Sequence, residues 1–357
     1  MRLWQRVMGE NGEGTMVPFT LENLDPNRKA LICCPGMLVT EENGEASIQQ
    51  LGTLFVGTAS RLLGNQDIDT KVQFLCVSYV DECEPTFNIA LYNQNPNHHY
   101  CKEAEALARS FFVPRLVDAQ HRRLTPKALE AVAQAMHNVT FFTYSYGSVF
   151  AGEVANALSV RMHVLGYTEE ERISVLQNIH VLSFGNIANV TALHYPKFSG
   201  ISISGTNDIV ACQKWPGFRE HVDRDRQDNL VVHKLPGNRL HVEMRLPTEH
   251  VRWTKSNGFL EHRRERDSNA HNVALYTTAG IRCDAHNKNW RDPHNIVPYI
   301  VETTLNNMVF RDGTEDIRDM LRPIRSIQRR GTMRVPPTPA LQQVITEGFV
   351  RGHSQSR

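Results

Sequence analysis

The fold is decided by the stretch VTFFTYSYGSVFAGEVANALSV, residues 139–160. Its first six residues are β-branched or aromatic and predict a strand, whereas the closing VFAGEVANALSV fits a helix. Ser145 stands at the junction, with the small residues Thr143 and Gly147 two places before and after it. A serine between a strand and a helix, flanked by small residues, is typical of a nucleophile elbow, because larger side chains would clash in so tight a turn.

Four other apolar runs predict further strands of the same sheet. Each is short, continuous and ended by polar or turn-forming residues, which is typical of strands covered on both faces. The runs are Lys29–Cys34, Val72–Val80, Ile179–Phe184 and Ile201–Ser204.

Helices with recognisable ends lie between these strands. Thr125-Pro126 offers an N-cap with proline at the first helical position, and apolar residues then recur at helical spacing. Thr168 and Glu171 form a capping box. The alternation of strands and helices predicts an α/β fold, a mostly parallel sheet with helices on both faces.

Composition excludes several classes of protein. The chain has 357 residues and a formal net charge of +1, so it has no overall field for holding nucleic acid. No run of about 18 apolar residues predicts a transmembrane helix, and the start of the chain lacks the apolar core of a secretory signal. The seven cysteines are scattered without a Cys-x-x-Cys pair, which favours a cytoplasmic protein without a structural zinc.

The chain divides into one large domain and a tail. We expect residues 1–321 to form the α/β domain, with an insertion at about 81–123 that carries the polar cluster NQNPNHHY. Residues 322–357 are basic, contain several prolines and lack apolar periodicity, which predicts a poorly ordered C-terminal tail.

From about residue 29 to 275 the chain resembles the α/β-hydrolase superfamily of serine esterases, lipases and thioesterases. The family's Gly-x-Ser-x-Gly pattern is matched as Thr143-x-Ser145-x-Gly147, with threonine in place of the first glycine. The resemblance implies an α/β-hydrolase-like fold and a Ser-His-Asp triad with Ser145 as nucleophile. It implies neither a metal nor an organic cofactor.

Asp208 is the candidate acid. It lies in Gly205-Thr-Asn-Asp208-Ile-Val210, after the strand that follows the elbow region, and this arrangement resembles the acid loop of the family. A buried carboxylate there would fix the tautomer of the catalytic imidazole. Alternatively, Asp208 only forms an Asx-turn.

Two histidines are candidates for the base. His271 is followed five residues later by Tyr276 and by an apolar helix start, which resembles the catalytic histidine turn of the family. His241 is closer to Asp208 in sequence, but Leu240–Leu246 alternates like a strand and would place His241 in mid-strand. We therefore favour His271 and keep His241 as the alternative.

The oxyanion hole of such enzymes uses two backbone N–H groups. By position Tyr146 supplies one, and Met37, or Leu38 next to it, supplies the other from the loop after the first apolar run. Alternatively, Pro35-Gly36 only turns the chain.

Further polar clusters predict less specific features. His98-His99 is expected in a solvated loop rather than at a metal. Glu261–Asp267 is a mixed-sign surface that could meet an anionic head group, and Asp81, Glu82 or Glu84 could replace the acid.

Together these features predict a hydrolase of carboxylic esters or thioesters, with a small-molecule or lipid acyl substrate and no nucleic-acid partner. Tyr144 and Tyr146 beside Ser145 suggest an aromatic cleft. Two different functions stay open: a non-catalytic binding or scaffold protein on the same fold, and a hydrolase exported as an effector through a signal in the tail.

Overall fold

The structure is a computed structural model of the whole chain. It describes residues 2–9, 14–25, 28–36, 68–79, 101–187, 198–205, 231–235, 239–244, 249–256 and 259–266, with shorter pieces at 56, 59–60, 63, 89, 91–92, 94–95, 208, 271, 276, 305–306 and 309.

A mixed, mostly parallel sheet of nine strands forms the centre of the described structure, in the order β2-β1-β4-β3-β5-β6-β7-β9-β8. All five strands predicted from apolar runs are present and lie next to one another in parallel pairs. They are β3 (Lys29–Cys34), β4 (Val72–Ser78), β5 (Val139–Tyr144), β6 (His180–Phe184) and β7 (Ser199–Gly205).

The strands toward the two edges of this sheet were not all predicted. β1 (Arg2–Met8) and β2 (Gly14–Phe19) pair at one edge, and β8 (Val231–Leu235) and β9 (Arg239–Met244) at the other. Only β9 was expected, from its alternating pattern. β10 (Glu249–Ser256) and β11 (Phe259–Arg266) form a separate two-stranded sheet.

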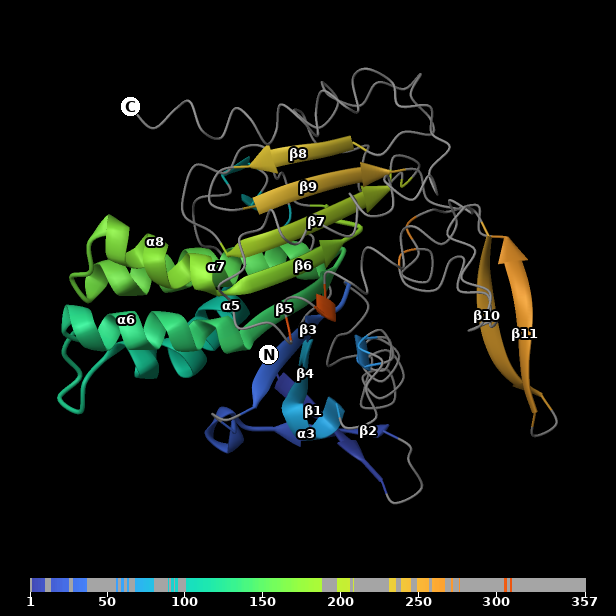
Figure 1. Ribbon diagram of the computed structural model, residues 1–357, viewed down its shortest axis with the longest axis horizontal. Helices are drawn as coiled ribbons and strands as arrows, with labels where there is room; N and C mark the ends of the chain where they lie inside the picture. The colour runs from blue at the N-terminus through green and yellow to red at the C-terminus, as the bar shows by residue number, and fades with distance from the viewer. Residues whose placement is uncertain are drawn as a thin grey trace.

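The long described helices form one layer against the central strands. Figure 1 shows them gathered beside β5 and β6. α7 packs on β3, β5 and β6, and α5 and α8 pack on α7. The helices whose bounds the structure describes are α3 (Ile68–Lys71), α5 (Lys102–Leu107), α6 (Pro126–Ala135), α7 (Tyr146–Val164) and α8 (Glu169–Asn178). The short 3₁₀-helical segments are η1 (Leu21–Asn23), η4 (Val113–Leu116) and η5 (Met136–Asn138), and η3 (Ala108–Phe112) is a short π-helix.

Side chains on both faces of the central strands are buried. One set faces the helical layer and joins its core, including Ile32, Leu75 and Phe141. The alternate residues of the same strands, among them Leu31, Phe74 and Phe142, are also fully buried. This two-sided burial explains why the sequence shows continuous apolar runs instead of alternation.

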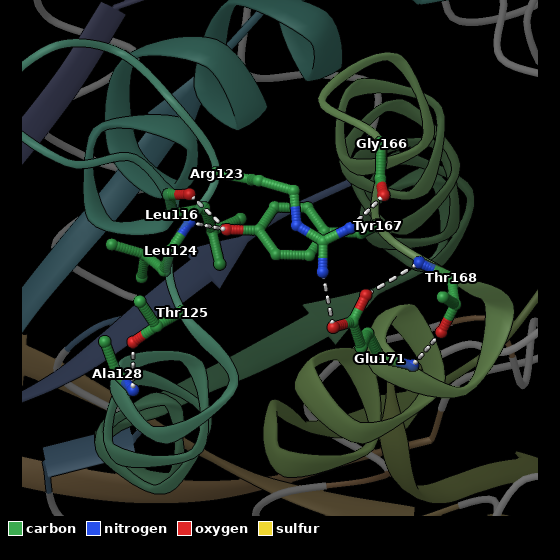
Figure 2. Close-up of polar contacts among 9 residues, drawn as sticks. All are labelled: Leu116, Arg123, Leu124, Thr125, Ala128, Gly166, Tyr167, Thr168 and Glu171. Carbon is green, nitrogen blue, oxygen red and sulfur yellow. Dashed lines mark hydrogen bonds and ion pairs between the residues drawn. The ribbon is translucent and has the colours of Figure 1, made fainter.

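The predicted helix starts are both present, and a polar network joins them. The Thr125 hydroxyl accepts from the Ala128 N–H, and Thr168 and Glu171 complete the capping box of α8. Figure 2 shows Arg123 between the two helices, where it bonds Glu171 and the Gly166 carbonyl and lies over the ring of Tyr167. This network ties α6 to α8 at the end of α7 remote from Ser145.

The second half of the predicted insertion belongs to the helical layer. Residues 102–116 form α5, η3 and η4, whose apolar side chains, such as Leu107 and Phe112, are fully buried in the main core. Most of residues 81–100 and the whole predicted tail lie outside the described residues, so these predictions stay open. In the described part of the chain, no helix is long and apolar enough to cross a membrane.

Candidate active site

The candidate site lies at the carboxyl ends of the parallel strands, where ligands bind in open α/β sheets. Ser145 directly follows β5 and directly precedes α7, as the sequence predicted. Its backbone has φ 52° and ψ −120°, which is strained for a residue with a side chain. The Ser145 N–H donates to the Phe184 carbonyl oxygen at 3.2 Å, which helps to hold the turn in place.

His271 lies against the serine hydroxyl. Its Nε2 is 2.9 Å from Ser145 Oγ, and its Nδ1 is 2.9 Å and 3.0 Å from the two carboxylate oxygens of Asp208. Three residues from distant parts of the sequence thus form one hydrogen-bonded chain.

The contacts define the direction of these hydrogen bonds. A carboxylate only accepts, so the His271 Nδ1–H donates to Asp208 and leaves the Nε2 lone pair facing Ser145. The Ser145 hydroxyl then donates to Nε2. This is the arrangement in which an imidazole can take the proton of a serine.

Tyr276 is a second partner of Asp208. Its hydroxyl donates to Asp208 Oδ2 at 2.7 Å and accepts from the Gly205 N–H at 2.9 Å. Burial, together with the nearby Asp208 carboxylate, raises the pKa of Tyr276 well above its usual value, so the hydroxyl keeps its proton. The sequence singled out Tyr276 only as part of the histidine turn, because its spacing cannot show a bond to Asp208.

The start of α7 lies at the serine. Tyr146 is the first residue of this 19-residue helix, so its N–H lies at the positive end of the helix dipole, where donors have no acceptor within the helix. Gly36 also lies beside Ser145, since an added Cβ at position 36 would be 3.4 Å from the serine Cβ. The two backbone segments expected to hold an oxyanion therefore meet at Ser145, although Met37 and Leu38 themselves lie outside the described residues.

Tyr79, which follows β4, holds the loop that carries Gly36. Its hydroxyl donates to the Pro35 carbonyl oxygen at 3.0 Å, and its ring packs edge-on against Tyr146 at 4.8 Å between centroids. Burial raises the pKa of Tyr79 well above its usual value, which keeps this donor protonated. No sequence pattern pointed to Tyr79.

The two tyrosines that flank Ser145 have different surroundings. The Tyr146 side chain is only 1% exposed and points into the core, where it contacts Tyr79 and the Cys101 thiol. Tyr144 is partly exposed. The aromatic cleft predicted from both residues therefore contains at most Tyr144.

His241, the second candidate base, does not contact the serine. It is buried in the middle of β9, opposite Ser202 of β7 and His233 of β8, as its alternating pattern predicted. Five residues of the polar clusters lie outside the described residues, namely His98, His99, Asp81, Glu82 and Glu84. For Glu261–Asp267 the structure describes only the backbone of β11, through Arg266.

Comparison of the chain with models of protein families found no match, and a search of curated proteins found none either.

Proposed function

We propose that the protein is a serine hydrolase of the α/β-hydrolase type that cleaves carboxylic esters or thioesters. One observation carries the proposal: the continuous hydrogen-bonded chain from Ser145 through His271 to Asp208, with the serine on a strained turn between a strand and a helix. Strained backbone of this kind persists only where the surrounding structure enforces it, and it is concentrated at active sites.

The first half of the reaction forms an acyl-enzyme. His271 Nε2 takes the proton of the Ser145 hydroxyl as Oγ attacks the carbonyl carbon. Asp208 stabilises the imidazolium through the Nδ1–H bond. When the tetrahedral intermediate collapses, the imidazolium protonates the leaving alcohol or thiol, and the acyl group stays on Oγ.

The second half repeats these proton transfers with water. His271 takes a proton from a water molecule, whose oxygen attacks the acyl carbon, and the imidazolium then returns a proton to Ser145 Oγ. The oxyanion formed in both halves is held by the Tyr146 N–H at the start of α7 and by a second N–H from the loop that begins at Pro35-Gly36. Every group that this reaction requires is supplied by the chain, the substrate and water.

An apolar acyl group is the favoured substrate class. The partly exposed Tyr144 ring beside Ser145 provides apolar surface near the attacked carbonyl. Acyl chain length is best determined with a series of p-nitrophenyl esters, from acetate to palmitate.

The proposal is tested by labelling the folded protein with a fluorophosphonate, which reacts with activated serines. We expect stoichiometric labelling of the wild type and none of Ser145→Ala. Ser159→Ala is a matched control, since Ser159 lies on the same helix and its hydroxyl accepts from Arg172 far from the site. Absence of labelling in folded wild-type protein would contradict the proposal and favour the non-catalytic binding protein.

The same probe decides between the two candidate bases. His271→Gln should abolish labelling, whereas His241→Gln should keep it, because His271 lies within hydrogen-bond distance of Ser145 Oγ and His241 does not contact it. The reverse result would assign the base to His241.

A further inference from the structure

We propose that Tyr144 is a positioning residue that docks His271 onto the nucleophile turn. The inference rests on the proposed function for its catalytic meaning, but the docking itself is a structural claim with its own readout. It gives the residue before the serine a role that neither the serine pattern nor the triad assigns.

Two separate contacts join Tyr144 to His271. The Tyr144 hydroxyl donates to the backbone carbonyl oxygen of His271 at 3.0 Å. The Tyr144 ring also lies face to face with the imidazole, with 5.1 Å between centroids and 25° between planes. One side chain thus holds both the main chain and the ring of His271.

The sheet places this ring where it can reach the histidine. Tyr144 is the last residue of β5 and pairs in register with Phe184, the last residue of β6, so both side chains point to the same face. The two rings lie 5.5 Å apart, and Tyr276 packs against both. The position of the Tyr144 ring is therefore set by its neighbours as well as by His271.

Gly185 provides the space for this stack. Its φ is 58°, and an added Cβ would lie 2.9 Å from Tyr144 Cε2 and 3.4 Å from His271 Cε1. A side chain at position 185 would therefore collide with the tyrosine and crowd the imidazole. The glycine after β6 thus lies beside this contact and leaves room for it.

His271 needs such a contact because it is far from Ser145 in the sequence. His271 comes 126 residues after Ser145, so its hydrogen bond to the serine closes a long loop. The bonds from Ser145 and Asp208 hold the two ring nitrogens but not the main chain of His271, whereas catalysis requires the ring to be held within about 0.5 Å of its productive position. Tyr144 is adjacent to Ser145 in sequence, so it ties the main chain of His271 to the turn that carries the nucleophile.

The stack also favours the charged form that the reaction creates. When His271 becomes an imidazolium, the face of the Tyr144 ring attracts the positive charge. Loss of the ring should therefore slow acyl transfer more than loss of the hydroxyl alone. Tyr144→Phe removes only the hydrogen bond to the His271 carbonyl, and Tyr144→Leu removes both contacts.

The docking is measured by proton NMR of protein that carries ¹⁵N-labelled histidine. The readout is the low-field signal of the His271 Nδ1–H that is bonded to Asp208, assigned by its loss in His271→Gln. We expect a sharp signal in the wild type, a weaker or faster-exchanging one in Tyr144→Phe, and none in Tyr144→Leu or Gly185→Ala. The fluorophosphonate rate should fall about threefold in Tyr144→Phe and by about tenfold or more in Tyr144→Leu, at roughly 1.4 kcal/mol per factor of ten.

Tyr167→Phe is the matched control. Tyr167 is buried, whereas Tyr144 is partly exposed. The Tyr167 hydroxyl also bonds backbone groups, but Tyr167 follows the far end of α7, about 28 Å along a helix of that length from Ser145. It should lower the thermal unfolding temperature and leave the His271 signal and the labelling rate unchanged.

The outcomes separate this inference from the proposed function. An unchanged Nδ1–H signal in folded Tyr144→Leu, or no such signal in the wild type, would overturn the docking role. A wild-type signal that depends on Tyr144, in protein that no fluorophosphonate labels, would uphold the docking role and reject the hydrolase. If the wild type and Tyr144→Leu are labelled at the same rate, the hydrolase is upheld and the docking role of Tyr144 is rejected.

Discussion

The Cα of Gly147 lies directly against the carbonyl group of Cys34, so that a Cβ at position 147 would overlap the Cys34 carbonyl oxygen. Gly147 is in the first turn of α7, and Cys34 ends β3. The nucleophile helix can approach the sheet this closely only because residue 147 has no side chain. The contact joins the serine turn to the strand from which the Pro35-Gly36 loop departs.

Gly147→Ala should therefore push α7 away from β3. Overpacking of this kind costs about 1–3 kcal/mol of the free energy of unfolding, and it should also slow fluorophosphonate labelling by moving Ser145. Urea unfolding and labelling kinetics measure the two effects. Gly166→Ala is the control: its φ of 84° makes alanine strained, but the nearest atom to an added Cβ is 4.0 Å away. If Gly147→Ala is as stable and as reactive as the wild type, the close contact is not required.

Tyr276→Phe should impair both stability and labelling. The substitution removes a donor to Asp208 and the hydroxyl that accepts from the buried Gly205 N–H, which costs about 1–3 kcal/mol. Asp208 then holds His271 less rigidly, so we expect labelling to slow by about tenfold. Stopped-flow labelling and urea unfolding are the measurements.

Tyr167→Phe provides a comparison for this prediction as well. Like Tyr276, Tyr167 accepts from a backbone N–H, that of Leu124, but it donates to the backbone carbonyl of Leu116 instead of a carboxylate. It should lose similar stability and keep the wild-type labelling rate. Equal slowing in both variants would mean that the effect of Tyr276 comes from general loosening of the fold.

Tyr79→Phe should weaken the oxyanion-binding loop. The substitution keeps the ring packed on Tyr146 but removes the hydrogen bond to the Pro35 carbonyl. We expect kcat for a p-nitrophenyl ester to fall about threefold to tenfold with little change in KM, because the loop acts on the transition state. A rise in KM at unchanged kcat would instead place Tyr79 in substrate binding.

Acid should destabilise the protein through His180. Burial, with His137 and Lys29 nearby, lowers the pKa of His180 to about 4, so the folded protein keeps this ring neutral. The unfolded chain binds a proton near the ordinary histidine pKa of about 6.5, and unfolding therefore takes up a proton between about pH 6.5 and 4. The free energy of unfolding should fall as pH drops through this window, by up to about 3 kcal/mol from His180.

The measurement is urea unfolding at a series of pH values. In His180→Phe the free energy of unfolding should fall less between about pH 6.5 and 4 than in the wild type. His163→Gln, a substitution on the exposed surface of α7, should leave the pH dependence as in the wild type. The same slope in His180→Phe and in the wild type would assign the acid sensitivity to other groups.

The central strands could be predicted from the sequence because they are buried on both sides. Lys29–Cys34 and Val139–Tyr144 have the predicted bounds, since nearly every residue of a doubly covered strand is apolar or β-branched. β1 and β2 were missed because β2 is the edge strand and β1 lies next to it, where Val7 and Val17 are exposed and charged residues are tolerated. An edge hairpin has no pattern that separates it from a polar loop.

The sequence by itself determined the position of Ser145. A strand, a tight turn and a helix follow one another along residues 139–160, and local sterics restrict which residues can occupy the turn. It also left two histidines as candidates for the base, and the alternation around His241, which indicated a strand, favoured His271.

Only the tertiary structure decided which side chains meet Ser145. Ser145 and Asp208 lie near each other because the parallel strands β5 and β7, after which they come, end at one edge of the sheet. His271 and Tyr276 follow the separate β10-β11 sheet, and their hydrogen bonds to Ser145 and Asp208 span more than 60 residues of sequence. The Tyr79 hydrogen bond depends on β4 lying next to β3, and the Tyr144 stack depends on a histidine that comes 127 residues later in the sequence. Strand order is a property of the whole packed chain, and no local run of residues encodes it.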